Sequence, residues 1–428
     1  MRSRGDAGRQ TNIAATVCIV GGGPAGVMLG LLLARTGIEV VVLEKHDDFV
    51  RGIGDDRVHD TVHPSTLEVL AEIGLADRFL ALPHHKAHVV RFFQDGGRRD
   101  IADFRELGLR YPYIAFMPQW DFLSLLADEA QCFPNFRMRT GSRVHQLLFE
   151  DGRVAGVRYR DAGGEGEIRS VLTVAADGRH STVRAAAGLR PRSFGTPMDV
   201  VMFRVARRPS DPDEGYRVCV TSGRTVVTIP RDVSWNIAYM VRKGGYAQLR
   251  SRGIEALRND VARLVPFLAD RVHELTGFHA TRFFDVRMNR LRRWHQPGLL
   301  CIGDAAHAMS PLGGVGVNLA VQDAVATANL LTEPLIAAQG RGTPVPESAT
   351  AALQRRRQPP AAVTQALQRL VQRHGIERSL RGGVATNYRA IVACPFARIV
   401  ISRLVGLGVS PEHVRFSATG AVGGPVTR

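Results

Sequence analysis

A glycine-rich segment between two apolar runs constrains the fold of this chain more than any other feature. The segment consists of Gly21, Gly22, Gly23, Pro24, Ala25 and Gly26. Residues 16–20 before it read as a buried strand, and residues 24–36 read as a helix that Gly37 ends. Residues 39–43 form a second, valine-rich run. The pattern therefore predicts a βαβ unit of the Rossmann type.

The three spaced glycines match the G-x-G-x-x-G pattern that holds a dinucleotide. Gly21 permits the tight turn, Gly23 lets the backbone approach a pyrophosphate, and Gly26 lets the helix pack closely on the strand. Backbone amides and the positive end of the helix then bind the phosphates. Glu44 ends the next strand, where a carboxylate accepts a hydrogen bond from an adenosine ribose. A glycine turn followed by a random surface acid is the alternative, which the strand–turn–helix–strand context disfavours. The predicted dinucleotide contacts are Gly21, Gly23, Pro24, Ala25, Gly26, Glu44 and Lys45.

A second signal follows the apolar run of residues 299–302. Gly303 and Asp304 come first, and a carboxylate at a strand end can bind a ligand hydroxyl. The glycines farther on put backbone beside a flat ring, and a helix that begins near Val317 points its positive end at the same place. Such a helix end favours the negative charge of a reduced flavin by about 0.3–2 kcal/mol. The predicted contacts are Gly303, Asp304, Pro311, Gly314, Gly316, Val317 and Asn318.

These residues resemble the C-terminal flavin motif of the p-hydroxybenzoate hydroxylase-like, or group A, flavoprotein monooxygenases. A third motif of that family is recognisable at residues 177–184, and the three motifs follow the family's order over most of the chain. The resemblance implies that Asp177 and Gly178 lie near the FAD pyrophosphate, in a segment tied to nicotinamide binding. It also implies FAD contacts from Arg57, Gln119 and Val144.

The resemblance implies a single-component FAD-dependent monooxygenase that hydroxylates a phenolic or polyketide-like aromatic small molecule. NADPH or NADH would reduce the FAD as a transient electron donor, and O2 would then react through a flavin C4a-hydroperoxide. Relatives place a proline at the position of Pro311 against the substrate cavity. A base that deprotonates a phenol would be useful, and His59 is the candidate, with a loop histidine that closes the FAD site as the alternative. His307 is expected to pack structurally.

Other reactions of the same fold stay open. Epoxidation or Baeyer–Villiger-type oxygenation in secondary metabolism is the nearest alternative, because a fold does not fix a substrate. A flavin halogenase is disfavoured because Trp120, Trp235 and Trp294 are isolated and form no Trp-x-Trp motif. A flavin-binding protein without turnover is the non-enzymatic alternative.

Composition narrows the set of partners. The formal net charge is +16, but arginines spread along the chain supply nearly all of the positive charge, with only three lysines. We therefore expect no nucleic-acid or membrane partner, and a monomer or homodimer. The five cysteines are far apart and form no Cys-x-x-Cys pair, which indicates a reducing cytoplasm. The histidines at 84, 85 and 88 have no carboxylate or cysteine at ligand spacing, so no metal is expected.

The expected fold is α/β (α+β): a Rossmann-like FAD-binding domain with an inserted β-sheet substrate domain and a helical C-terminal segment. Residues 147–150 and 153–160 read as a hairpin, because Asp151 and Gly152 suit a type I′ turn. The predicted boundaries are 1–74, 111–181 and 285–345 for the FAD-binding domain, 75–110 and 182–284 for the substrate domain, and 346–428 for the helical C-terminal region.

Overall fold

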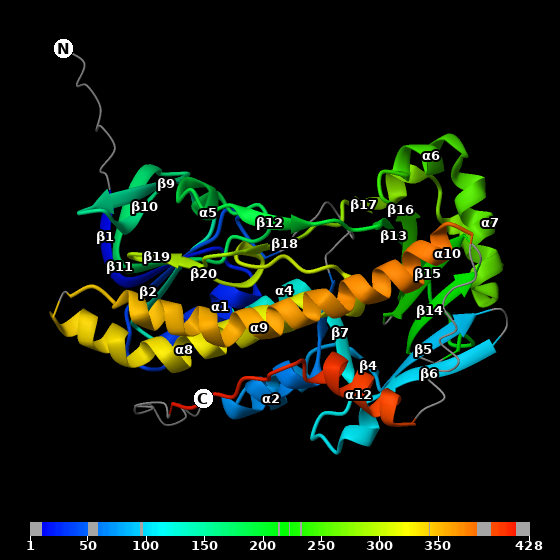
Figure 1. Ribbon diagram of the computed structural model, residues 1–428, viewed down its shortest axis with the longest axis horizontal. Coiled ribbons are helices and arrows are strands. Elements are labelled where there is room, and N and C mark those ends of the chain that lie inside the picture. Colours follow the sequence, from blue (N-terminus) through cyan, green and yellow to red (C-terminus); the bar gives the residue numbers. More distant parts are fainter. Residues whose placement is uncertain are drawn as a thin grey trace, which may run out of the picture.

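The computed structural model describes residues 11–49, 59–94, 97–212, 215–221, 223–231, 233–341, 343–382 and 395–416. It has two halves, each organised by a β-sheet, and long helices run along the front of both halves in Figure 1.

A mixed sheet of eight strands organises the first half. Its core order is β19-β20-β11-β1-β2-β8, and β10 and β9 continue from β11 as an antiparallel hairpin. The strands β8, β2, β1, β11 and β20 run parallel to their neighbours, and such sheets are buried on both faces, which explains their valine-rich runs. The strands are β1 (Thr11–Val20), β2 (Val40–Leu43), β8 (Phe136–Arg139), β9 (Arg143–Glu150), β10 (Arg153–Asp161), β11 (Gly164–Ala175), β19 (His295–Gln296) and β20 (Leu299–Cys301).

The predicted βαβ unit is present, with two differences at its ends. β1 begins at Thr11 rather than at residue 16, because its polar first residues pair with β11 along their whole length, from Thr11 opposite Gly166 onward. The first helix, α1 (Pro24–Ala34), ends two residues earlier than predicted. The chain leaves it through Gly37, whose φ is 83° and whose amide donates to Ala34 O.

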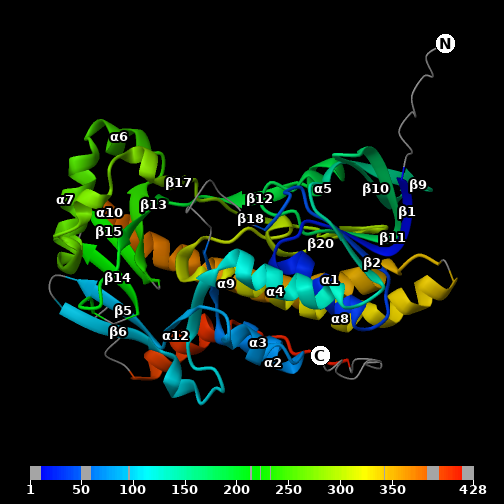
Figure 2. The same cartoon turned by 180° about the vertical axis from the view of Figure 1, so that it is seen from behind.

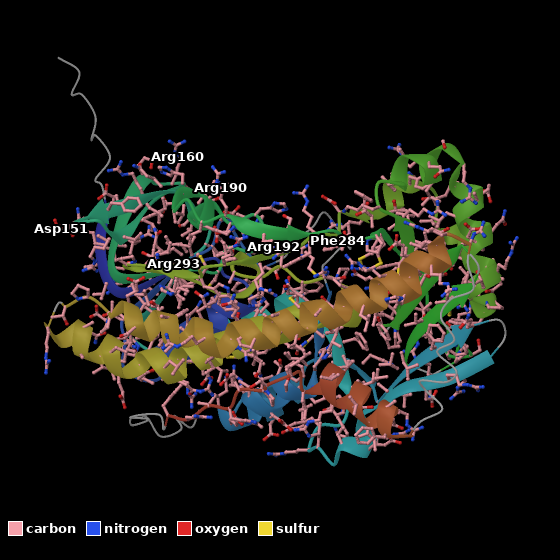
Figure 3. The ribbon with its side chains drawn as sticks, viewed as in Figure 1. Asp151, Arg160, Arg190, Arg192, Phe284 and Arg293 are labelled. Atoms are coloured by element: carbon pink, nitrogen blue, oxygen red, sulfur yellow. The ribbon has the colours of Figure 1, made fainter. Side chains whose placement is uncertain are left out.

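The predicted hairpin joins β9 and β10 at the outer end of this sheet. Its turn residues Asp151 and Gly152 have φ of 49° and 75°, the left-handed values that a type I′ turn requires. Figure 3 places Asp151 at the extreme tip of the hairpin, far from the second half.

Helices cover one face of the eight-stranded sheet. α1 is buried along ten of its residues and packs between α4 and α8, so it lies in the centre of the first core. A helix buried on all sides needs no polar face, which explains its uniformly apolar sequence. The helices of this half are α1, α2 (Pro64–Glu72), α3 (Ala76–Leu80), α4 (Gln119–Gln131), α5 (Thr182–Ala186), α8 (Gly316–Arg341) and α9 (Glu347–Val371).

The second half contains a seven-stranded sheet of order β17-β13-β16-β15-β14-β5-β6. One face packs against α6 (Tyr246–Ser251) and α7 (Ile254–Leu264), with Trp235 and Leu257 fully buried between them. The opposite face turns toward the first half. The strands are β5 (Val89–Gln94), β6 (Gly97–Asp103), β13 (Met198–Ala206), β14 (Tyr216–Thr221), β15 (Arg224–Pro230), β16 (Ser234–Arg242) and β17 (Arg282–Phe284).

Two small sheets connect the halves. The strand pair β12–β18 crosses from one half to the other in Figure 2, and the three-stranded sheet β3-β7-β4 lies beside α2 and α4. Their strands are β3 (His59–Val62), β4 (His85–Ala87), β7 (Ile114–Pro118), β12 (Pro191–Phe194) and β18 (Met288–Leu291).

The C-terminal helices bridge the halves, in keeping with the predicted helical tail. α9 packs on α8 and β19 in the first half and continues through a π-helical turn, Gln372–Glu377, into α10 (Arg378–Leu380), which contacts β15 in the second. α12 (Pro395–Gly406) packs against β6 and so covers part of the second half. No helix among the described residues is long and apolar enough to cross a membrane.

Candidate active site

A cavity of about 700 Å³ lies between the two halves, at the carboxyl ends of the central parallel strands. Most of the sequence-predicted contacts line it. These are Gly21, Gly23, Pro24, Ala25, Glu44, Lys45, Gln119, Val144, Asp177, Gly178, Asp304, Pro311, Gly314, Gly316 and Val317. Residues from six separate stretches of sequence therefore meet in one place.

Five predicted residues are not among the lining residues. Gly26, Gly303 and Asn318 lie behind the wall. Arg57 falls outside the described residues, and for His59 the structure describes the backbone in β3 but not the side chain.

The glycine turn has the geometry that its sequence predicts. Gly21 has φ of 109°, and a Cβ there would lie 2.4 Å from the carbonyl oxygen of Ala176. A Cβ on Gly26 would lie 1.9 Å from Gly21 O, so this glycine serves close packing and has no place in the cavity wall. A Cβ on Gly23 would meet nothing within 4 Å, because Gly23 faces the open cavity. The first turn of α1 has no side-chain cap, so its N-terminal end is available to an anion.

Glu44 closes the adjoining corner of the cavity. Its side chain is buried, and its two carboxylate oxygens accept hydrogen bonds from the amides of Gly22 (2.7 Å) and His46 (3.1 Å). These bonds hold the glycine turn against the end of β2 and fix the direction in which the carboxylate faces the cavity. The geometry fits a carboxylate that accepts a ribose hydroxyl.

Asp177 organises the segment opposite the glycine turn. Its Oδ2 accepts from the amides of Thr182 (2.7 Å) and Val183 (3.1 Å) at the start of α5. Burial raises the pKa of this carboxyl, against the opposing effect of the hydrogen bonds that it accepts. Its Oδ1 is buried and has no hydrogen-bond partner in the described part of the chain although Asp177 lines the cavity, an arrangement that a bound ligand would complete.

Arg179 connects the two halves of the cavity. Its Nη2 lies 3.4 Å from Oδ2 of Asp304, and its guanidinium carbon lies 4.6 Å from the centre of the Phe284 ring. Figure 3 shows Phe284 at the junction of the halves. Arg179 therefore lies at the boundary between the end of the cavity that the glycine turn lines, here called the cradle, and the end that the seven-stranded sheet lines.

Several basic side chains gather at the dinucleotide end of the cavity, beside the carboxylates of Glu44, Asp177 and Asp304. Lys45, His46, Arg143 and Arg179 line it, together with His180. Burial lowers the pKa of His180, and the nearby Arg287, Arg179, Arg184 and Lys45 lower it further. Such a field attracts a diphosphate, whose negative charges would compensate it.

Asn318 holds the loop that carries the second glycine cluster. Its Oδ1 accepts from the amide of His63 (2.9 Å) and from Thr66 Oγ1 (2.7 Å), and its Nδ2 donates to the carbonyl oxygens of Thr61 (3.1 Å) and Gly314 (3.3 Å). Its side chain is thus fully occupied within the protein, so any contact of Asn318 with a cofactor would come from its backbone.

The second sheet contributes a wall that sequence reasoning did not resolve into residues. Alternate residues of β13, β15 and β16 face the cavity, while the residues between them belong to the core beneath α6 and α7. The signal in the sequence is this period-two alternation, but the cross-strand register that selects the face is not local. The wall comprises Val200, Met202, Arg204, Tyr216, Val227, Ile229, Asn236, Ala238, Met240, Arg282 and Phe284, and Phe203, which belongs to the core beneath, also reaches the cavity.

The arrangement suits a redox cofactor that reacts with a second ligand. The glycine cradle and positive side chains occupy one end of the cavity, the backbone turn at Pro311 and Gly314 lies in the middle, and the mostly apolar sheet wall forms the other end. The flat ring of such a cofactor would lie beside Pro311. Its phosphates would then extend toward the glycine turn on one side, and an aromatic substrate on the sheet wall would face the ring from the other side. Among the described residues no three His, Cys, Asp or Glu side chains form a metal-binding group.

Comparisons with known proteins agree with this arrangement. The FAD binding domain family matches residues 14–366. The 6-methylpretetramide 4-monooxygenase of Streptomyces rimosus is 32% identical over 335 residues, 74% of this chain and 75% of that protein. The 3-demethoxyubiquinol 3-hydroxylase of Escherichia coli is 27% identical over 326 residues, 75% of this chain and 80% of that protein.

A solved structure shares the fold. PqsL, a probable FAD-dependent monooxygenase from Pseudomonas aeruginosa, superimposes with a TM-score of 0.72 at 22% identity, covering 86% of this chain and 98% of that one. The resemblance drawn from the three sequence motifs is confirmed. The chain therefore belongs to the group A FAD-dependent aromatic hydroxylases and is a monooxygenase with an FAD-binding domain.

Proposed function

We propose that this enzyme hydroxylates a phenolic or polyketide-like aromatic compound with O2, using NADPH or NADH as the transient electron donor. The observation that carries the proposal is the continuity of the cavity from Gly23, through Pro311, to the sheet wall at Met240. A cofactor in the cradle and an aromatic ring against the sheet would then meet without leaving the protein.

Relatives support the substrate class. One is named for 6-methylpretetramide, and another for protoasukamycin. The sheet wall is largely aliphatic and aromatic, which suits a planar ring system with few polar substituents.

The cradle residues would hold FAD by its two ends. Amides at the start of α1 and the positive side chains near Lys45 would bind the diphosphate, and Glu44 would accept a ribose hydroxyl. The turn at Gly314 and the N-terminus of α8 would lie beside the ring system. The further proposed contacts are Gly178, Gln119, Val144, Asp177, Asp304, Gly316, Val317, the backbone of Asn318, and Arg57.

Bound FAD supplies the hydride acceptance and the activation of O2; the protein supplies orientation and exclusion of water. The apolar wall around Ile229 and Met240 keeps the reacting centre dry. Arg179, at the junction of the halves, is proposed to help place the nicotinamide. His59 stays the candidate base for deprotonating a phenol, from a strand that borders the cavity at Thr61.

The remaining assignments belong to the same proposal. The FAD-binding domain would comprise 1–74, 111–181 and 285–345, and the substrate domain 75–110 and 182–284. A cytoplasmic location is proposed because Cys18, Cys219 and Cys301 are buried free thiols, which suit a reducing compartment.

The test is ligand-dependent reduction of the bound flavin. The FAD-loaded protein is mixed anaerobically with NADPH and, separately, NADH, alone and with a panel of phenols, naphthols and hydroxyanthraquinones, while the flavin absorbance is followed. We expect one class of ligand to accelerate bleaching and to gain one oxygen atom when air is admitted. A product with an epoxide or an inserted ring oxygen would replace hydroxylation by the alternative reaction of this fold. Bound flavin that neither nicotinamide reduces with any ligand would refute the proposal.

A further inference from the structure

Asn236 is a buried amide on the sheet wall without a hydrogen-bond partner among the described residues. The residue is 5% exposed, it lines the cavity, and its Oδ1 accepts no hydrogen bond. Its Nδ2 donates to no residue in the described part of the chain. Buried polar groups in folded proteins are almost always paired, so an amide left unpaired at a cavity wall calls for a partner outside the chain.

Asn236 lies in a row of residues that crosses four strands. It is directly opposite Arg204 on β13 and Ile229 on β15. Tyr216 continues the row on β14, because Arg217 pairs with Thr228 and the preceding residue therefore falls opposite Ile229. Neighbours in such a row have Cβ atoms about 4.5–5.5 Å apart, so one ligand can touch several of them.

The two end members of the row, Tyr216 and Arg204, add hydrogen-bond donors. Tyr216 stacks on Phe116 with ring centres 6.0 Å apart, and burial raises its pKa to about 12, so that its hydroxyl keeps its proton and can donate. The guanidinium of Arg204 is always charged. Among the described lining residues no carboxylate belongs to the sheet wall. The row therefore combines the unpaired acceptor Oδ1 of Asn236 with donors farther along it, which suits a ligand hydroxyl group.

The neighbouring rows are mainly apolar. One contains Val227, Ala238 and Met202, with Arg282 at the edge strand, and the next contains Met240, Val200 and Phe284. A flat ring system lying on these rows would bring only one of its edges to Asn236.

We propose that Asn236 orients the substrate through a hydrogen bond that its Oδ1 accepts from a hydroxyl group at one edge of a planar, otherwise apolar aromatic compound, with Arg204 on the adjacent strand and Tyr216 two strands away in the same row. This inference rests on the proposed function, because it identifies how the same site selects its substrate. One side chain of the sheet would thus determine which ring position faces the cofactor.

The substitution Asn236→Leu separates this role from a structural one. Leucine has the same branching and the same number of side-chain heavy atoms and removes the unpaired amide, and its larger methyl groups face the open cavity, so the ligand-free protein should keep or gain stability. The control is Thr228→Val. Thr228 is also fully buried with an unpaired Oγ1, but it lies on the opposite face of β15 and does not line the cavity.

The experiment compares 1-naphthol with naphthalene, which differ only by the hydroxyl group. Calorimetric titration of the FAD-loaded protein, without nicotinamide, gives the dissociation constant of each probe. We expect wild type and Thr228→Val to bind 1-naphthol about tenfold more tightly than naphthalene, the effect of one net hydrogen bond. In Asn236→Leu the ratio should fall toward one, with thermal stability retained.

The inference is overturned if wild type shows no preference for 1-naphthol, or if Asn236→Leu keeps that preference. Failure of the proposed function appears separately, as bound flavin that nicotinamides never reduce, since the titration needs no turnover. A matching consequence in turnover is that Asn236→Leu should reduce its flavin but yield less hydroxylated product per NADPH consumed than the Thr228→Val control.

Discussion

Nε2 of His307 lies 2.6 Å from Oδ2 of Asp323, and both side chains are 1% exposed. The same carboxylate accepts from the amide of Gly303 and from Nε of Arg357, each at 3.0 Å. Arg357 in turn lies 3.4 Å from Glu412, in the segment after α12. One buried aspartate thus joins the loop beside the cavity to two helices and to the C-terminal segment.

Asp323→Asn is expected to destabilise the enzyme by about 3–5 kcal/mol, because it removes the nearer of the two carboxylates that balance the buried guanidinium of Arg357 and leaves only Glu412, 3.4 Å away. FAD affinity should fall as well, since the Gly303 loop loses an anchor. Urea unfolding and FAD titration measure the two effects. Glu255→Gln removes an ion pair whose carboxylate is 69% exposed and should cost less than about 1 kcal/mol. Equal losses in both variants would show that the buried network is not special.

The ionisation of Asp323 also affects how the free energy of unfolding falls at acid pH. Burial raises the pKa of Asp323, but His307 and Arg357 outweigh it and hold the pKa below the usual value. Its contribution is therefore fully present above the ordinary aspartate pKa of about 3.9 and is lost as the pH falls through the lower folded value. The free energy of unfolding of Asp323→Asn should decline less steeply in acid than that of wild type. Parallel acid limbs would contradict this assignment.

Two glycines of the fingerprint should respond differently to alanine. Gly23→Ala adds a Cβ in open space with φ of −81°, so the free protein should keep its melting temperature while FAD binding weakens about tenfold or more. Gly26→Ala places a Cβ 1.9 Å from Gly21 O and should destabilise the free protein itself. Melting curves without FAD and fluorescence titration with FAD distinguish the two. Unchanged FAD affinity in Gly23→Ala would show that the glycine turn does not bind the cofactor.

His180 should report the arrival of the diphosphate. Burial and the surrounding arginines lower its pKa in the free protein. FAD should raise the pKa by neutralising that field, whereas adenosine, which has no phosphate, should leave it nearly unchanged. Histidine NMR titration of the free, FAD-bound and adenosine-bound protein measures this. A pKa that FAD leaves in place would mean that the diphosphate lies elsewhere.

The parts of the site that could be predicted from the sequence are those made by local chemistry. Gly21 and Gly26 can be recognised in the sequence, because a tight turn and a close helix contact need glycine within a few residues of each other. Motif spacing likewise placed Asp304 and Gly314 beside the same cavity.

The sheet wall could not be predicted in the same way. Asn236 faces the cavity only because β16 pairs with β13 and β15 in one register, and a slip of one residue would turn it to the core. The role of Asn318 could not be predicted either. A motif indicated that this residue belongs to the site, but only the structure shows that its side-chain amide donates to the carbonyl oxygen of Thr61.

The most direct test of the central claim is a single turnover under isotopic oxygen. The FAD-loaded enzyme is reduced anaerobically with NADPH or NADH in the presence of the ligand that best accelerates reduction, and ¹⁸O₂ is then admitted. One ¹⁸O atom is expected to enter the aromatic product for each nicotinamide oxidised. A flavin that neither nicotinamide reduces, or a product whose new oxygen comes from water, would contradict that claim.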